Sequence, residues 1–303
     1  MLTVHNVSKS FKMRQKTDSK LRDFFYPQFS SFQALNSLSF HVNQGEKVAF
    51  IGPNGAGKST TIKAILGILH YDTGEIGVFG KDPRTERKVI AKQTSSVFGQ
   101  RSQLLYHLPL IDSFNFFRII YEIPSEVFQQ RLDRFVNRFG VEEFLYQPVR
   151  KLSLGQRMKG EIIASLLHSP KAIFLDEPTV GLDIIAKKVL YEILNEIHKE
   201  EHITIFLTSH DLNDIENLCE RAIVINRGAI LYDGQLEDLM KEYANKKFIR
   251  YKEADSLDWE TVEIENTPAL LQKVVKHLLE TKNIEDIMIE NLPLEEVIEE
   301  FYR

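Results

Sequence analysis

A short apolar segment, EKVAFIG (46–52), runs directly into a glycine-rich turn, and few folds accommodate that arrangement. The turn, GPNGAGKST, fits the pattern G-x-x-x-x-G-K-S/T of a phosphate-binding loop. Glycines let the backbone N–H groups turn inward, and a following helix aims its positive N-terminus at the same point. We therefore predict a buried strand, a phosphate loop and a helix in this order. The loop residues are Gly52, Pro53, Asn54, Gly55, Ala56, Gly57, Lys58, Ser59 and Thr60.

Further apolar segments alternate with helical patterns along the chain, which favours an α/β fold. LTVHNV (2–7) alternates like a half-buried strand. AIFLDE (172–177) and ITIFLTS (203–209) are rich in β-formers and nearly uncharged. Such runs are typical of central strands in a parallel sheet that is covered on both faces.

Two regions depart from this alternation. Residues 105–165 read as a helical subdomain inserted into the sheet domain, because SEVFQQRLDRFVNRFG (125–140) carries an apolar helical face: Phe128, Leu132, Phe135 and Phe139. Residues 241–303 read as a small α+β appendage after a main domain of residues 1–240. In the appendage, strands 259–265 and 284–290 flank a helix that Thr267 and Pro268 cap, giving a β-α-β unit, and Pro293 opens a terminal helix. The apolar stripe of the flanked helix is Leu271, Val274, Val275 and Leu278.

Composition excludes several classes of protein. The net charge of −5 gives no positive field for nucleic acid, and Cys219 is the only cysteine, so no internal disulfide forms. No apolar run approaches the roughly 18–20 residues that span a bilayer. The start, MLTVHNVSKSFK, is patterned like a strand and not like a signal peptide, so we expect a cytosolic protein.

Two adjacent carboxylates end the predicted strand AIFLDE. At a strand end Asp176 and Glu177 point in different directions, so Asp176 can hold Mg²⁺ while Glu177 polarises a water that attacks a γ-phosphate. A solvated acidic turn is the alternative, and the phosphate loop upstream disfavours it.

Three weaker signals surround these motifs. KLSLGQR (151–157) precedes an apolar helix, His210 follows a buried strand in TSHD, and Gln100 lies in VFGQRSQ. Singly, Ser153 reads as a helix N-cap, His210 as a strand-end hydrogen bonder and Gln100 as a surface amide. Their joint occurrence in this order indicates a shared nucleotide site.

The order GPNGAGKST, Gln100, LSLGQ, AIFLDEP, GLD (181–183) and His210 resembles the ATP-binding subunits of ABC transporters over residues 1 to about 240. The resemblance implies a P-loop NTPase core with an antiparallel β subdomain and the inserted helical subdomain. VFGQRSQLLYHLP, LSLGQRM, LLHSP and EPTVGLD more narrowly resemble exporter-type ATPases that pair with separate permease chains.

The resemblance implies an ATP hydrolase in which two copies stack head to tail around two ATP molecules. Ser153, Gly155 and Gln156 of one copy would then face the γ-phosphate bound by the other copy, and Asp183 would lie at the dimer seam. The implied partners are this second copy and a transmembrane permease, with the subunit on the inner face of the membrane.

Within one copy, the resemblance implies roles for six residues. Glu177, His210 and Gln100 would be catalytic, and Ser59, Asp176 and Gln100 would hold Mg²⁺. Phe11 in KSF would stack on adenine.

Two positions depart from the family pattern. Leu154 stands where the commonest signature has glycine, which affects how the helix N-terminus packs against the opposing ATP. Phe11 replaces the more frequent tyrosine and keeps the ring.

Residues 12–32 form a basic and then aromatic insertion. One interpretation is a patch that contacts an anionic membrane surface or the permease. The other is a long surface loop whose aromatic rings pack on the antiparallel subdomain. We favour the loop.

Two other functions share the same motifs. A soluble ATPase of this kind acting on nucleic acid or ribosomes would carry two nucleotide domains or coiled-coil arms, and the sequence has neither. A regulatory switch would not need both Glu177 and His210.

Overall fold

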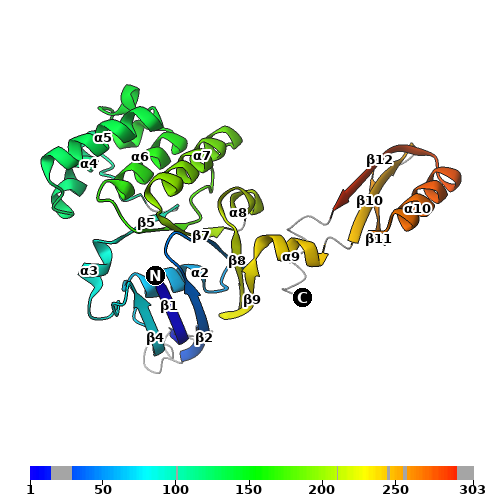
Figure 1. Cartoon of the computed structure of the whole chain (residues 1–303), viewed down its shortest axis with the longest axis horizontal. Coiled ribbons are helices and arrows are strands. Elements are labelled where there is room, and N and C mark those ends of the chain that lie inside the picture. Colours follow the sequence, from blue (N-terminus) through cyan, green and yellow to red (C-terminus); the bar gives the residue numbers. More distant parts are fainter. Residues whose placement is uncertain (15–28, 100–101, 210, 244–245, 255–257, 292–303) are drawn as a thin grey trace, which may run out of the picture. The chain divides into compact units, whose positions relative to one another are not determined.

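The computed structural model describes residues 1–14, 29–99, 102–209, 211–243, 246–254 and 258–291. The chain divides into two compact units, Met1–Asp233 and Gly234–Arg303 (Figure 1). The boundary expected near residue 240 lies inside helix α9 (Leu236–Tyr243), which the structure places in the second unit.

The first unit is built on a six-stranded sheet in the order β5-β6-β7-β3-β8-β9. Four neighbouring pairs, from β5 to β8, are parallel, so the carboxyl ends of β3, β6 and β7 meet at one edge. Three buried phenylalanines pack against one another across the centre with tilted rings, whose centroids are 5.3 Å apart for Phe50 and Phe206 and 5.5 Å apart for Phe174 and Phe206. The strands are β3 (Lys47–Ile51), β5 (Thr94–Phe98), β6 (Ala172–Asp176), β7 (Thr204–Ser209), β8 (Arg221–Asn226) and β9 (Ala229–Gln235).

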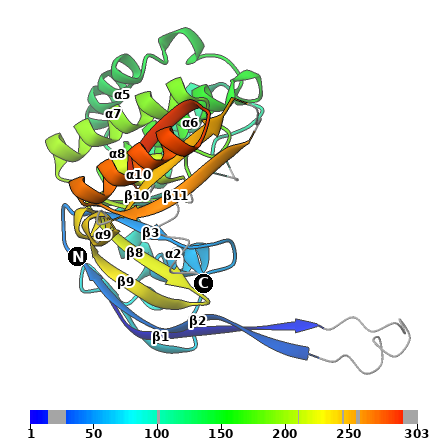
Figure 2. The ribbon, with the colours of Figure 1, turned by 90° about the vertical axis from the view of Figure 1, so that its right-hand side faces the viewer.

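A separate antiparallel sheet has the order β2-β1-β4, with β1 (Leu2–Arg14), β2 (Phe29–Val42) and β4 (Thr73–Val78). Helix α2 (Lys58–Ile65) shares one apolar core with both sheets through Ile62 and Ile65. β1 and β2 continue past β4 as a two-stranded ribbon (Figure 2). This ribbon is where the paired residues Phe11 and Phe32 lie.

The predicted helical subdomain is inserted between β5 and β6. Its helices are α4 (Leu110–Ile120), α5 (Ser125–Phe139) and α6 (Leu154–Leu166), with short 3-10 turns at Glu142–Phe144 and Val149–Lys151. Helix α3 (Arg87–Ala91) precedes β5. The predicted apolar face of α5 is buried at all four positions, which confirms the helical periodicity: Phe128, Leu132, Phe135 and Phe139.

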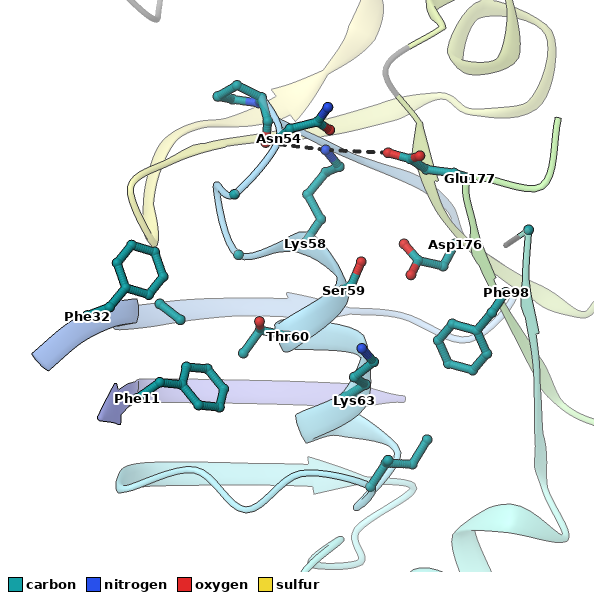
Figure 3. A pocket seen from close by; sticks show the side chains of 16 residues that line it. Phe11, Phe32, Asn54, Lys58, Ser59, Thr60, Lys63, Phe98, Asp176 and Glu177 are labelled. Atoms are coloured by element: carbon teal, nitrogen blue, oxygen red, sulfur yellow. Dashed lines mark hydrogen bonds and ion pairs between the residues drawn. The ribbon is translucent and has the colours of Figure 1, made fainter. Parts of the chain in front are cut away.

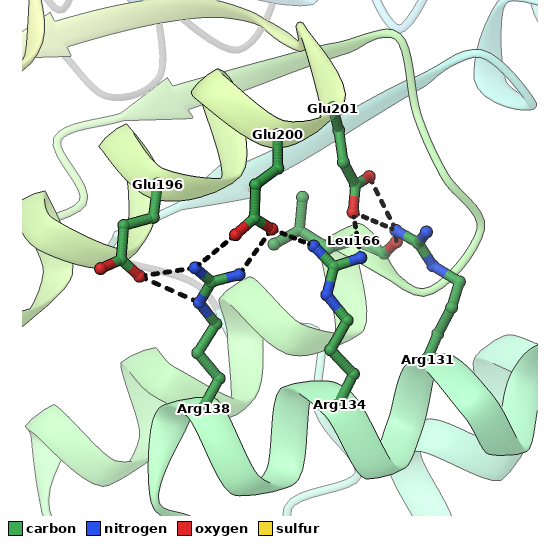
Figure 4. Close-up of polar contacts among 7 residues, drawn as sticks. All are labelled: Arg131, Arg134, Arg138, Leu166, Glu196, Glu200 and Glu201. Atoms are coloured by element: carbon green, nitrogen blue, oxygen red, sulfur yellow. Dashed lines mark hydrogen bonds and ion pairs between the residues drawn. The ribbon is translucent and has the colours of Figure 1, made fainter.

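An ionic ladder joins α5 of the helical subdomain to α7 (Ile184–Glu201) (Figure 4). Arg138 binds Glu196 and Glu200, the latter at 2.8 Å. Arg131 and Arg134 both bind Glu201, at 3.0 and 2.9 Å. Because several pairs share partners, the network holds the two helices more firmly than isolated surface pairs do.

The second unit is a three-stranded antiparallel sheet, β11-β10-β12, with α10 (Pro268–Thr281) packed on it. The expected strands are β11 (Trp259–Glu265) and β12 (Ile284–Asn291), but β10 (Lys246–Glu253) lies between them and pairs with both. Thr267 is the N-cap of α10 and Pro268 its first residue, as expected, and the Thr267 side chain makes no capping hydrogen bond. Pro293 lies outside the described residues.

Candidate nucleotide-binding site

A cavity of about 550 Å³ opens where the carboxyl ends of β3 and β6 face the β1–β2 sheet (Figure 3). Seven of the predicted loop residues line it: Pro53, Asn54, Gly55, Gly57, Lys58, Ser59 and Thr60. Gly52 and Ala56 instead support the loop from behind, since Ala56 is buried and Gly52 offers its carbonyl to Lys58. The remaining lining residues are Phe11, Phe32, Ala34, Lys63, Ile68, Phe98, Gly99, Asp176 and Glu177.

Two of the loop glycines are required by their surroundings. Gly57 is the N-cap of α2 with φ +110°, and an added Cβ would lie 2.6 Å from the carbonyl oxygen of Ala34. A Cβ on Gly52 would lie 2.6 Å from the carbonyl oxygen of Ile225. The loop therefore packs too closely on its neighbours for any side chain at either position.

Lys58 is the buried cation of the site. Its Nζ donates to the Gly52 carbonyl at 2.6 Å and lies 3.8 Å from Glu177 Oε1. Burial lowers the pKa of Lys58, while the carboxylates of Glu177 and Asp176 oppose that shift. Phosphate oxygens in the cavity would supply the counter-charge that a buried ammonium needs.

The two adjacent carboxylates diverge, as predicted. Glu177 has a positive φ of 52°, an uncommon conformation for a residue other than glycine, and its N–H donates to the Thr208 carbonyl at 2.9 Å. Glu177 points toward Lys58, whereas Asp176 points toward Ser59 (Figure 3). Thr208 Oγ1 donates to Asp176 Oδ1 at 2.5 Å and so fixes that carboxylate on β6.

Two aromatic rings line the opposite end of the cavity. Phe11 was predicted, and its register partner Phe32 was not assigned to the site. Lys9 Nζ lies 5.6 Å from the centroid of the Phe11 ring. Phe32 is 43% exposed in this chain, so its ring is available for contact. Lys63, Ile68 and Phe98 are further lining residues that the motifs did not indicate.

The LSLGQ segment lies at the N-terminus of α6. Ser153 is its N-cap: its Oγ accepts from the Gln156 N–H at 3.2 Å, and Gln156 Oε1 accepts from the Ser153 N–H at 2.9 Å. Ser153, Gly155 and Gln156 do not line the cavity. The side chain of Leu154 is exposed and contacts the loop at Gly181.

Asp183 also lies away from the cavity. It is the N-cap of α7, and its Oδ1 accepts from the Ala186 N–H at 2.8 Å. The next two residues, Ile184 and Ile185, are 85% and 77% exposed. Adjacent apolar side chains this exposed are typical of a contact surface.

Gln100 and His210, the other two predicted residues, lie outside the described residues.

Comparison with known proteins places this site in a family. Residues 35–180 match the family model described as ABC transporter. The bacitracin transport ATP-binding protein BcrA of Bacillus licheniformis is 30% identical over 236 residues, which cover 75% of this chain and 72% of that protein. An energy-coupling factor transporter ATP-binding protein of Clostridium perfringens is 30% identical over 234 residues, covering 76% of this chain and 81% of that protein.

A solved structure shares the fold as well. The structure of an ATP-binding subunit of an ABC transporter aligns with a TM-score of 0.66 at 27% identity, covering 80% of this chain and 93% of that one. These matches confirm the predicted P-loop α/β fold and the broader resemblance to ATP-binding subunits of ABC transporters. The chain belongs to the ABC transporter family, as one of its ATP-binding, ATP-hydrolysing subunits.

Proposed function

We propose that two copies of this chain close head to tail around two ATP molecules, and that hydrolysis in this dimer drives a separate transmembrane permease. The supporting observation is that a single chain assembles only half of the predicted site. Lys58, Asp176 and Glu177 line the cavity, whereas Ser153 lies elsewhere, exposed at a helix N-terminus. A second copy would bring that N-terminus to the first copy's ATP.

The helix N-terminus of α6 suits a phosphate contact in trans. No acidic residue occupies its first turn, so the positive end of the helix dipole is not offset there. The Ser153 hydroxyl accepts its capping bond from Gln156, and this leaves its hydrogen able to donate to a phosphate oxygen. The N-cap interpretation and the nucleotide interpretation of Ser153 are therefore compatible.

Mg²⁺ is part of the proposal, and the residues fit it. Ser59 and Asp176 present hard oxygen donors to the same cavity. Among the residues that the structure describes there is no group of three metal-ligating side chains. This agrees with Mg²⁺, which takes one or two protein ligands and completes its shell with phosphates and water. When bound, the ion would neutralise charge on the β- and γ-phosphates.

Hydrolysis needs a base beside the γ-phosphate, and we assign Glu177 to it. Lys58 would bind the β- and γ-phosphates, and Glu177, held 3.8 Å from Lys58 Nζ, would then face the terminal phosphate and polarise the attacking water. We also assign catalytic roles to Gln100 and His210, on the resemblance of their motifs to those of ABC transporter ATP-binding subunits. Phe11 would stack on the adenine.

The helical subdomain offers a surface for the permease. Phe116, Ile119 and Ile120 of α4 are all exposed, with Ile119 exposed to 69%. Their spacing places them on one side of the helix, where they form an apolar face on an otherwise solvated surface. Within the described residues, no helix has both the length and the apolar character to cross a bilayer. We propose that the permease is a separate chain and that this subunit lies against it on the inner face of the membrane.

Export is the direction we propose, on the strength of the motifs LSLGQRM and VFGQRSQLLYHLP. Action on nucleic acid or ribosomes is disfavoured, since the chain is acidic and its named relatives are transport proteins.

The partner assignment is tested by purification from membranes. A tagged Glu177→Gln chain, with ATP and Mg²⁺, is expected to co-purify from detergent extracts with a polytopic membrane protein that stimulates wild-type ATPase activity in proteoliposomes. Ile119→Glu should abolish this association while ATP binding persists, and Leu231→Glu, also at an exposed apolar residue, should not. Recovery of ribosomes or nucleic acid in place of a membrane protein would contradict the proposal.

A further inference from the structure

Asp214 is a fully buried carboxylate outside the cavity. It lies in α8 (Leu212–Leu218), just after β7, and has no exposed surface. Its Oδ2 accepts hydrogen bonds from Thr179 Oγ1 and Ser209 Oγ, and its Oδ1 accepts one from the Tyr191 hydroxyl, each at 2.5 Å. A carboxylate is an acceptor at both oxygens, and hydroxyl donors to it make short, strong bonds.

The three donors come from three segments of the proposed catalytic machinery. Thr179 lies two residues after Glu177. Ser209 ends β7 and directly precedes His210. Tyr191 lies in α7, the helix that Asp183 caps. Burial and the nearby Asp214 carboxylate raise the pKa of Tyr191, so the phenol keeps its proton and remains a donor.

The network also holds both sequence neighbours of His210. Ser209 Oγ accepts from the Asp211 N–H at 2.9 Å while it donates to Asp214. Asp211 forms an ion pair with Lys187 of α7, and it accepts from the Asn213 N–H as the N-cap of α8. The described residues on either side of position 210 are thus held in place, Ser209 by Asp214 and Asp211 by Lys187 of α7.

We propose that Asp214 is a positioning residue for ATP hydrolysis. It fixes the segment after Glu177, the end of β7 and the helix that Asp183 caps relative to one another, and it does not contact the nucleotide itself. This inference rests on the proposed roles of Glu177 and His210. A displacement of about 1 Å in a catalytic group can lower a rate by about a hundredfold, so a shared anchor for these segments affects turnover more than binding.

Asp214→Asn tests the proposal with little change in shape. An amide has one acceptor oxygen and an NH₂ group, so at least one of the three hydroxyls loses its acceptor. We expect the dissociation constant for ATP to stay within about threefold, and single-turnover hydrolysis to fall by about 10- to 100-fold. The matched control is Asp233→Asn, which takes one of its two acceptor oxygens from the buried Arg221, bonded at 2.7 and 2.8 Å, and should lower the melting temperature without changing hydrolysis per folded chain.

Ser209→Ala is the milder second variant. It should lower the hydrolysis rate while ATP affinity is retained. The double variant should lose less activity than the sum of the two single effects, in free-energy terms, because both substitutions act through the hydrogen bond between Ser209 and Asp214. If Asp214→Asn and Ser209→Ala hydrolyse ATP at the wild-type rate per folded chain, Asp214 is only structural. Glu177→Gln distinguishes failure of the proposed function from failure of this inference. If the Glu177→Gln chain still hydrolyses ATP, the proposed function is refuted. If Glu177→Gln is inactive while Asp214→Asn is fully active, only the inference about Asp214 is refuted.

Discussion

At the scale of single residues, ATP affinity depends most directly on Lys58. Its ammonium is buried against the Gly52 carbonyl and Glu177, beside the N-terminus of α2. A charge-assisted hydrogen bond contributes about 1.5–3 kcal/mol, so Lys58→Ala should weaken equilibrium ATP binding by about 10- to 100-fold. Lys88→Ala, at an exposed lysine of α3 outside the cavity, is the matched control and should change affinity by less than about threefold. Unchanged affinity in Lys58→Ala would remove the phosphate-loop assignment.

Base recognition is a second residue-scale question. Phe11 and Phe32 are register partners on β1 and β2, and both rings line the cavity. Stacking on an aromatic ring contributes about 1–3 kcal/mol per base, so we expect Phe32→Ala to raise the dissociation constant for ATP by about tenfold. Phe29→Ala, on the same strand but outside the cavity, should leave it unchanged. Titration with a fluorescent ATP analogue decides the matter, and equal affinities for the two variants would contradict a base contact at Phe32.

Site residues that belong to a contiguous motif could be predicted from the sequence. Site residues that reach the cavity only through the tertiary fold could not. Lys58 and Ser59 are specified by a local pattern of glycines whose spacing the loop geometry demands. Phe32 could not be assigned, because its place depends on a strand register that pairs it with Phe11 across a long insertion. No motif singles out Asp214, and only the fold shows it buried among three hydroxyls.

At the scale of elements, the buried strands and amphipathic helices of the first unit were predictable, because their apolar runs and periodicity are strong. β10 was missed, since KKFIRYKE is highly charged and shows only a weak strand pattern. It nevertheless lies in the centre of its sheet and buries Ile249 and Tyr251 beneath α10. Packing against a neighbouring helix therefore determines this strand more than its own propensity does.

His168 offers a test of how three elements meet. It follows α6, its Nε2 lies 3.0 Å from the Thr94 carbonyl of β5, and its ring stacks on Tyr121 at the end of α4, with centroids 3.8 Å apart. Burial lowers the pKa of His168 to about 4. Below an unfolded-state pKa of about 6.5, the unfolded chain binds a proton that the native chain does not. Stability is therefore retained above that pH and lost as the pH falls toward 4.

The expected loss between pH 7.5 and pH 5 from this residue is about 2 kcal/mol in the free energy of unfolding. His168→Gln cannot be protonated, so its stability should fall less than that of the wild type over the same interval. Urea unfolding at both pH values measures the difference. Equal pH dependence in the two proteins would show that His168 is not held neutral at the junction of α4, α6 and β5.

At the scale of the whole molecule, the central claim is that each ATP site is shared between two chains. Lys58 and Glu177 line the cavity of one chain, while Ser153 lies exposed elsewhere, and Ile184 and Ile185 are exposed beside Asp183. Shared sites predict that two defective chains complement each other. Lys58→Ala disables the phosphate loop, and Ser153→Arg places a bulky side chain at the trans contact, so either homodimer has two defective sites.

Single-turnover ATP hydrolysis by a covalently linked heterodimer of Lys58→Ala and Ser153→Arg chains tests this claim most directly. One of its sites combines the intact phosphate loop of the Ser153→Arg chain with the intact LSLGQ segment of the Lys58→Ala chain. The shared-site account predicts hydrolysis well above that of either linked homodimer. A linked heterodimer that forms stably, binds ATP and hydrolyses no more than the mutant homodimers would contradict it.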